Sequence, residues 1–434
     1  MHFDLPYGRG TLPADIPDDR VAAVLRGRLE GYKPPAPPEM LLSDALDAPI
    51  GSEPLEKLAV GKHNIVVIIS DHTRPVPSKL LLPPMLARLR QGAPDAEITL
   101  LVATGCHRGT TREELVSKCG EDIVKNERIV VHDCDDTANL VNLGTLPSGG
   151  KLIVNRLAAE ADLLVAEGFI EPHFFAGFSG GRKSVLPGVA SRTTVLANHN
   201  AAFIAHPRAR AGMLEDNPIQ RDMLWAAQTA KLRFIVNAVI NARHETVAVF
   251  AGGLEAAHKA GTDFLASLCG VTAEPAPITV TTNNGYPLDQ NVYQSVKGMS
   301  SAEPLNTDGG VIIMASACGD GIGGDAFLRF FKETPDAAAL LAKIEAVPAE
   351  ATTPDQWQAQ VFARILKNHR VIFLSECDPD TVRAFGMLPA HDFAEALALA
   401  DGIVGADAKV NVIPEGISII PAVRPAATRA PGSC

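Results

Sequence analysis

Short apolar runs that alternate with helical segments are the feature that most constrains how this chain can fold. Residues 64–70, 97–103 and 162–167 are rich in Val, Ile and Leu, as is typical of strands buried on both faces of a parallel sheet. A helix is predicted after the second run, where Thr111 and Glu114 have the spacing of a capping box. This alternation predicts βαβ units and a largely parallel, Rossmann-like sheet.

The alternation of predicted strands and helices continues in the second part of the chain. A Pro-rich segment at 274–277 precedes further strands, predicted at 278–282, 310–316 and 371–375. The length of 434 residues suits two or three domains, so we expect an α/β protein of two domains with the active site in the cleft between them. The predicted boundaries are an N-terminal domain at 1–272, which begins with a strand and a helix near 19–30, a C-terminal domain at 273–405, and a segment at 406–434 that packs back on the N-terminal domain.

Composition limits the classes of partner. The net charge of −11, with no basic cluster, argues against nucleic acid. No run approaches the roughly 18 apolar residues of a membrane helix, and the N-terminus lacks the apolar core of a signal peptide. Seven cysteines without a CxxC pair predict reduced thiols. We therefore expect a cytoplasmic protein that binds neither nucleic acid nor membranes.

Polar and titratable side chains follow three of the predicted strands. Asp71 and Arg74 come after the first strand, His107 after the second, and a long loop at 171–183 after the third. Open α/β sheets bind ligands at the carboxyl ends of their strands. The three loops therefore predict one binding crevice.

The loop Gly177–Ser184 is one residue away from a P-loop. Arg182 occupies the position before Lys183 where the Walker pattern requires glycine, so an NTPase site is disfavoured. Gly180 and Gly181 would still let the backbone approach a ligand closely, and free N–H groups could hold a phosphate. A phosphate cradle beside Lys183 is the interpretation that this segment favours, and a non-catalytic nucleotide-binding protein is one alternative that it leaves open.

A second glycine-rich segment, Gly319–Gly324, matches the dinucleotide-binding pattern G-x-G-x-x-G. The acidic residue expected about twenty positions later at a strand end is missing, because 338–347 has a helical pattern. We interpret this segment as a strand-to-helix turn. An NAD-dependent dehydrogenase is kept as an alternative function.

Three histidines and four pocket candidates complete the set. Two histidines on either side of a substrate could act as general acid and base, and a third could ligate a metal, although single loop histidines are more often structural. On one predicted helix two polar residues are spaced i and i+4, and two tryptophans could line a pocket or belong to the core. These candidates are the histidines 107, 173 and 199, the helical pair Tyr293 and Lys297, and the tryptophans Trp225 and Trp357.

Several motifs taken together resemble the nickel-dependent lactate racemase family, whose catalytic subunits use a nickel-pincer nucleotide. They occur in family order over most of the chain, and the long central motif is specific. The matching pieces are DHTRPVP (71–77), GCHRGTT (105–111), EPHFFAGFSGGRKSVLPG (171–188), ANHN (197–200), NVYQSVKG (291–298) and DQWQAQ (355–360). The resemblance implies an isomerase that racemises or epimerises a 2-hydroxy acid such as lactate.

The resemblance also implies a role for each motif residue. His107 and His173 look like the two catalytic acid/bases. Lys183 looks like the covalent anchor of the cofactor, and His199 like the ligand of Ni(II) in a square-planar site, a geometry that suits this ion. The implied cofactor contacts are Asp71, Arg74, Gly180 and Gly181, and the implied substrate contacts are Arg74, Tyr293, Lys297 and Trp357.

The implied reaction removes the α-hydrogen as hydride and returns it to either face of a planar 2-keto acid. Two bases are needed because the two enantiomers present their hydroxyl groups in different directions. The motifs do not distinguish lactate from malate, longer aliphatic hydroxy acids or sugar acids. The resemblance also implies that cofactor-biosynthesis proteins act as maturation partners.

Overall fold

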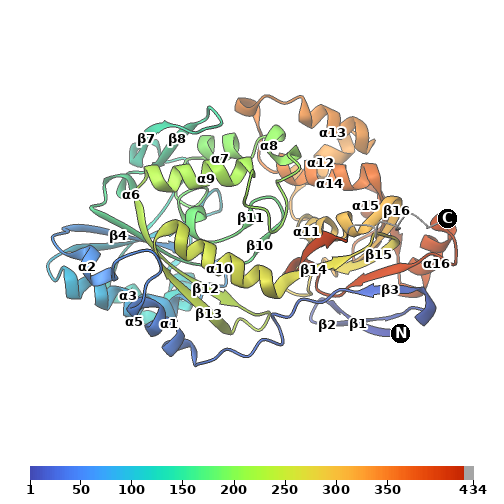
Figure 1. Cartoon of the computed structure of the whole chain (residues 1–434). Coiled ribbons are helices and arrows are strands. Elements are labelled where there is room, and N and C mark those ends of the chain that lie inside the picture. Colours follow the sequence, from blue (N-terminus) through green and yellow to red (C-terminus); the bar gives the residue numbers. More distant parts are fainter. Residues whose placement is uncertain (425–434) are drawn as a thin grey trace, which may run out of the picture. The chain divides into compact units, whose positions relative to one another are not determined.

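The computed structural model describes residues 1–424 and divides into two compact units (Figure 1). The N-terminal unit consists of residues 28–268 together with the short piece 348–352, and the C-terminal unit consists of residues 1–27, 269–347 and 353–424. Each unit is built on one six-stranded, parallel-dominated sheet. The prediction of an α/β protein with two Rossmann-like domains is confirmed.

The sheet of the N-terminal unit has the order β13-β12-β9-β4-β5-β6, and only β13 is antiparallel to its neighbour. From β4 the chain proceeds to β5 and β6 on one side and returns through β9 on the other, so a topological switch point lies between β4 and β9. Such a point is where open sheets bind ligands. The strands are β4 Asn64–Ser70, β5 Glu97–Ala103, β6 Arg128–Val131, β9 Leu163–Phe169, β12 Leu232–Ile240 and β13 Thr246–Gly252.

Helices cover both faces of this sheet. One face packs against the first five helices through a core of Leu, Ile and Val side chains, and Figure 1 shows α7 and α9 on the opposite side. The helices of this unit are α1 Pro38–Asp47, α2 Leu55–Ala59, α3 Ser78–Gly92, α4 Arg112–Cys119, α5 Glu121–Asn126, α6 Arg156–Glu160, α7 Arg192–Asn198, α8 Ala201–Ala205, α9 Pro218–Thr229 and α10 Leu254–Cys269. A hairpin of β7 (Leu140–Thr145) and β8 (Lys151–Asn155) lies outside the main sheet.

The sheet of the C-terminal unit is parallel throughout, with the order β18-β17-β16-β15-β19-β3. Its strands are β3 Val21–Val24, β15 Ala276–Thr282, β16 Asn306–Ala315, β17 Arg370–Leu374, β18 Leu388–Ala390 and β19 Val410–Ile413, and its helices are α11 Val292–Ala302, α12 Asp325–Glu333, α13 Ala337–Glu345, α14 Gln356–Asn368, α15 Pro379–Ala384 and α16 Phe393–Val404. Two further pairs are β1 (His2–Tyr7) with β2 (Gly10–Asp15) and β14 (Gly270–Ala273) with β20 (Ile420–Val423).

The two chain ends correct the predicted domain boundaries. Residues 1–27 belong to the C-terminal unit, because β3 pairs with β19. The helix predicted near 19–30 is wrong, since a single 3-10 turn at Asp18–Arg20 leads into β3. The segment after 406 belongs to the C-terminal unit, because β19 lies between β15 and β3. Residues 425–434, the rest of that predicted segment, lie outside the described residues.

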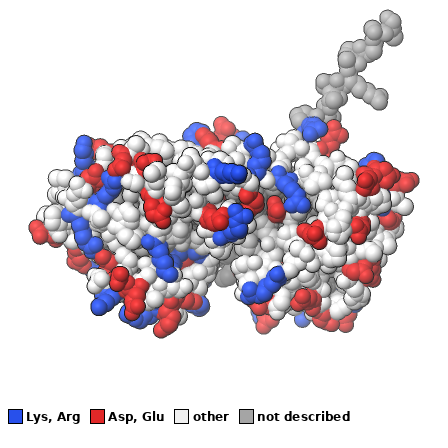
Figure 2. Space-filling model, turned by 90° about the horizontal axis from the view of Figure 1, so that it is seen from below, with Lys and Arg blue, Asp and Glu red and all other residues white. Residues whose placement is uncertain are grey.

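Charged side chains of both signs are interspersed on the face shown in Figure 2. Exposed ion pairs of the described chain include Arg192 with Asp135 and Lys259 with Asp263. Among the helices of residues 1–424, none is both long enough and apolar enough to cross a membrane.

Candidate active site

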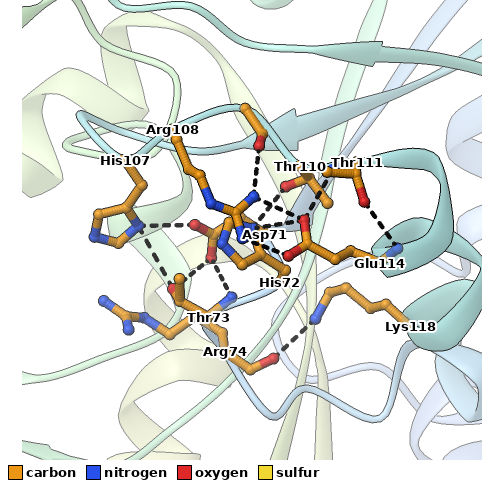
Figure 3. A network of polar contacts seen from close by, with 11 residues as sticks. Asp71, His72, Thr73, Arg74, His107, Arg108, Thr110, Thr111, Glu114 and Lys118 are labelled. Atoms are coloured by element: carbon orange, nitrogen blue, oxygen red, sulfur yellow. Dashed lines mark hydrogen bonds and ion pairs between the residues drawn. The ribbon is translucent and has the colours of Figure 1, made fainter. Parts of the chain in front are cut away.

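The first part of the site is a histidine–aspartate pair formed by the loops that follow β4 and β5 (Figure 3). His107 Nδ1 lies 2.7 Å from Asp71 Oδ2, and the Thr73 hydroxyl donates to Asp71 Oδ1 at 2.7 Å. Burial acts to raise the pKa of Asp71, but hydrogen bonds from His107 and Thr73 outweigh it and the net pKa is lowered. The ionised carboxylate therefore keeps a proton on Nδ1 of His107 and the ring lone pair on Nε2.

The second part is a short antiparallel ladder after β9, made of β10 (Pro172–His173) and β11 (Gly177–Phe178). In the turn that joins them, His173 Nδ1 accepts the backbone N–H groups of Ala176 (3.3 Å) and Phe175 (3.5 Å). The ring of Phe175 packs edge-on against His173, at 4.5 Å between centroids, and against His199, at 5.2 Å. Two of the predicted histidines thus contact the same phenyl ring.

The third part joins His199 and Lys183. His199 follows α7, and its Nδ1 lies 3.0 Å from the Val195 carbonyl oxygen, so Nδ1 carries the proton and Nε2 the lone pair. Burial, together with the nearby charge of Lys183, lowers the pKa of His199 to about 3. At neutral pH this buried ring is uncharged, which is the form in which imidazole ligates metals.

Backbone hydrogen bonds connect these parts. The Gly105 N–H, in the loop that carries His107, donates to the Gly188 carbonyl at 2.9 Å, and the Gly188 N–H donates to the Lys183 carbonyl at 3.1 Å. The exposed Arg74 lies in the Asp71 loop, on the same side of the network as the His107 ring (Figure 3). The N-terminal unit therefore brings together the candidates Asp71, Arg74, His107, His173, Lys183 and His199.

Packing inside the N-terminal unit constrains both glycines of the lysine loop, and their predicted contact with a ligand stays a prediction. Gly180 and Gly181 adopt left-handed φ values of 78° and 52°, and a Cβ would meet Asn237 at 2.8 Å from Gly180 and His258 at 2.8 Å from Gly181. The Gly181 N–H already donates to Asn237 Oδ1 at 2.9 Å, so the expectation of a free N–H there is wrong. Close packing inside the unit requires both glycines.

Arg182 is a residue whose part in this loop the sequence did not reveal. Its side chain is 1% exposed, and its guanidinium donates to the carbonyl oxygens of Ala176 (2.9 Å), Gly180 (3.2 Å) and Ser179 (3.3 Å). A bulky residue at this position would disturb a P-loop. Here the buried Arg182 side chain stabilises the loop through these hydrogen bonds to its backbone. The only signal in the sequence was its position before Lys183.

Glu167, near the end of β9, was also missed. It is buried, and its Oε1 accepts the Ser78 hydroxyl at 2.9 Å and the Ser70 hydroxyl and N–H at 3.2 Å. Ser70 and Ser78 flank the loop that carries Asp71, so one carboxylate fixes both ends of that loop. Burial raises the pKa of Glu167. An acid at the end of an otherwise apolar run was the available signal.

The three remaining candidates belong to the C-terminal unit. Tyr293 and Lys297 lie on α11, four residues apart as predicted. The Tyr293 side chain interacts with Trp357 and with Asp355, and burial is the main cause of its raised pKa. Asp355, which has a left-handed φ of 64°, was not singled out from the sequence. The unit thus gathers Tyr293, Trp357 and Asp355, with Lys297 one helical turn further along.

The glycine-rich segment Gly319–Gly324 forms a turn that supports α11. The N–H groups of Val292 and Tyr293 donate to the carbonyl oxygens of Gly321 (3.1 Å) and Ile322 (3.2 Å). A Cβ on Gly323 would meet Tyr293 at 2.7 Å. Contact with α11 accounts for Gly323, and left-handed φ values account for Gly321 and Gly324.

Acid should destabilise the N-terminal unit through its buried histidines. Burial lowers the pKa of His199 and that of His258 to about 3 each, whereas an unfolded histidine titrates near about 6.5. Between these values the unfolded chain binds more protons than the folded chain, so a lower pH favours unfolding. For each histidine, the free energy of unfolding falls by about 2 kcal/mol between pH 7 and pH 5.

Urea unfolding of wild type and His258→Gln at pH 5, 6 and 7 tests this expectation. The variant should show a shallower dependence of unfolding free energy on pH, by up to about 1.4 kcal/mol per pH unit. His244→Gln is the control, because His244 lies in an exposed turn. Equal slopes for wild type and His258→Gln would contradict the assignment.

Two parallel-sheet units and a strand-end site of imidazole, carboxylate and amine groups define an α/β enzyme, and comparisons with known proteins give its family. The model of the lactate racemase N-terminal domain matches residues 7–212, and that of the lactate racemase C-terminal domain matches residues 271–421. The chain is 52% identical over 420 residues to a lactate racemase of Thermoanaerobacterium thermosaccharolyticum, covering 96% of this chain and 99% of the relative. It is 51% identical over 419 residues to a lactate racemase of Lactiplantibacillus plantarum, with the same coverage of 96% and 99%.

Solved structures agree with these sequence relatives. The lactate racemase apoprotein from Thermoanaerobacterium thermosaccharolyticum superposes with a TM-score of 0.94 at 51% identity, covering 98% of this chain and 100% of that chain. A protein from Thermotoga maritima, at 21% identity and a TM-score of 0.63, covers 91% of this chain and 100% of that chain and shares the fold. The chain therefore belongs to the lactate racemase family, and it is an isomerase of the racemase class.

Proposed function

We propose that this protein interconverts the enantiomers of lactate by removing the α-hydrogen as hydride and returning it through a 2-keto acid intermediate. The names of the two relatives support lactate as substrate. The observation that carries the proposal is the Asp71–His107 pair at 2.7 Å, on a loop bonded through Gly188 to the Lys183 segment. Another 2-hydroxy acid, such as malate, a longer aliphatic acid or a sugar acid, is the alternative substrate.

The bonds at Nδ1 of the two histidines support a two-base mechanism, because they assign proton exchange with the substrate to Nε2 of each ring. His107 donates from Nδ1 to Asp71, so its Nε2 can accept the substrate hydroxyl proton. His173 accepts backbone N–H groups at Nδ1. In the proposal His107 takes the hydroxyl proton as a neutral base, and His173 returns a proton to the oxygen as imidazolium, since a neutral imidazole would have to become an imidazolate. Each ring returns to its starting state when the opposite enantiomer reacts.

The substrate carboxylate needs cationic and polar partners while the reacting carbon becomes planar. We propose Arg74 for this role, because guanidinium groups bind carboxylates in a bidentate manner and Arg74 is exposed beside the Asp71–His107 pair. Tyr293, Lys297 and Trp357 are proposed as further substrate contacts from the C-terminal unit. Asp71 acts through His107 in this proposal, because its carboxylate is already engaged by His107 and Thr73.

We further propose that a nickel-pincer nucleotide is attached to Lys183, with Ni(II) ligated by His199. The residues present fit such a group: His199 is buried, uncharged and oriented with its lone pair on Nε2, and imidazole is a suitable ligand for nickel. Lys183 is close enough to influence the His199 ring electrostatically. When bound, the group supplies an acceptor for the α-hydrogen. The proposal implies cytoplasmic maturation by cofactor-biosynthesis proteins.

Co-expression with cofactor-making proteins, followed by a chiral product assay, tests the function. The loaded protein should convert either pure enantiomer of lactate to the racemate, faster than it converts malate or longer hydroxy acids. Intact mass should show a covalent increase that maps to Lys183, and nickel should be nearly stoichiometric. Full activity without the mass increase and without nickel would contradict the cofactor, and turnover of another hydroxy acid alone would contradict lactate.

A further inference from the structure

Helix α4 contacts both loops that carry the Asp71–His107 pair, as Figure 3 shows. Its N-terminal end holds the His107 loop. The Glu114 carboxylate accepts the Thr111 N–H at 2.8 Å and Nη1 of Arg108 at 2.9 Å, and the Thr111 hydroxyl accepts the Glu114 N–H to complete the capping box. Because Arg108 directly follows His107, Glu114 fixes the backbone next to the proposed base.

The same helix also holds the Asp71 loop. Glu114 Oε2 lies 3.7 Å from Nδ1 of His72, which in turn is 3.1 Å from the Thr110 hydroxyl. The Lys118 ammonium donates to the carbonyl oxygen of Arg74 at 2.9 Å. Glu114 and Lys118 are four residues apart and therefore share one face of the helix. That single face joins the loops that follow two neighbouring strands.

Lys118 is partly buried, and several charged groups surround it. Burial lowers the pKa of Lys118, and the charges of Glu167 and Asp71 act against that effect. Glu167 binds Ser70 and Ser78 at the two ends of the loop, while Lys118 binds the carbonyl of Arg74 between them. The Asp71 loop is thus held at both ends and in its middle.

We propose that Glu114 and Lys118 are positioning residues that hold the Asp71 loop and the His107 loop in a fixed position relative to each other. They act through His107 and do not touch the substrate, so the inference rests on the proposed role of His107 as a base. The relative position of the loops matters because a misplacement of about 1 Å at a reacting group can cost on the order of 100-fold in rate. Contacts that orient metal-binding residues are typically worth about 10- to 100-fold in activity, and we expect a loss at the lower end of that range here.

Two substitutions remove the contacts with little change of shape. Glu114→Gln keeps a residue that suits the capping box but removes the negative charge opposite Arg108 and His72. Lys118→Met keeps the aliphatic stem and removes the donor, and Lys118→Arg restores a donor. The matched controls are Glu113→Gln, on the exposed side of the same helical turn, and Lys125→Met, an exposed lysine of α5.

Two readouts are needed, one with and one without the cofactor. In loaded enzyme, Glu114→Gln and Lys118→Met should each lower kcat by about tenfold, with a smaller change in KM, and Lys118→Arg should recover most of the loss. In cofactor-free protein, the Nδ1–H proton of His107, followed by NMR, should exchange with solvent about tenfold faster in Lys118→Met than in either control.

Each combination of results decides between the alternatives. Wild-type kcat and wild-type proton exchange in both variants would overturn the proposal, as would equal losses in the Glu113→Gln and Lys125→Met controls. A drop in thermal stability that accounts for the loss, without any change at His107, would also overturn it. Faster exchange at His107 with unchanged kcat would support the positioning role and instead contradict His107 as the base.

Discussion

The Asp71→Asn variant is expected to lose about 10³-fold in kcat while still binding substrate, because general base catalysis contributes about 10²- to 10⁴-fold. The carboxylate accepts the Nδ1–H of His107 at 2.7 Å. An asparagine can turn its amide NH2 towards Nδ1 and so favour the tautomer that carries its proton on Nε2. In that tautomer Nε2 of His107 has no lone pair with which to take the substrate hydroxyl proton.

The double variant shows whether Asp71 works through His107. His107→Gln alone should cost about as much as Asp71→Asn, and combining the two should cost little more, because residues that act as a unit are not additive. Asp95→Asn, which changes an exposed aspartate of the same unit, is the control and should be neutral. Additive losses in the double variant would show that Asp71 has a separate role, such as a direct contact to the cofactor.

Much of the fold follows from local sequence. The β-branched runs at Asn64–Ser70 and Glu97–Ala103 are strands with the predicted bounds, because strands buried on both faces need continuous apolar residues. The capping box of Thr111 and Glu114 is also present. The assignment of residues 1–27 failed because β3 pairs with β19, almost 400 positions along the chain. No local pattern encodes such a pairing.

In the candidate site, too, some features could be predicted from the sequence and others could not. Strand-end loops could be predicted to converge, since the carboxyl ends of neighbouring parallel strands share an edge, and β9, β4 and β5 are neighbours. Contacts that depend on side-chain direction could not be predicted. Arg182 turns inward to bind backbone carbonyls, and Glu167 reaches two serines on either side of a loop. Both are charged residues in buried places, where composition alone predicts apolar ones.

The Lys183→Arg and His199→Ala variants are expected to separate attachment of the cofactor from binding of the metal. Arginine keeps the positive charge but lacks a nucleophilic amine, because its pKa is above about 12. Lys183→Arg should therefore show no covalent mass increase after co-expression, and its kcat should fall by at least about 10⁴-fold. His199→Ala should keep the mass increase of the organic group, and the visible absorption of its nickel should change because the ion has lost one ligand.

The mass increase should be absent from Lys183→Arg and present in His199→Ala only if Lys183 is the anchor and His199 is not. Lys151→Arg, at an exposed lysine on β8, should retain both mass increase and nickel. A mass increase that persists in Lys183→Arg would move the attachment to another residue, and an unchanged visible absorption of the nickel in His199→Ala would remove this ring from the metal site. Since neither result depends on turnover, the roles of Lys183 and His199 can be judged even if the natural substrate is a hydroxy acid other than lactate.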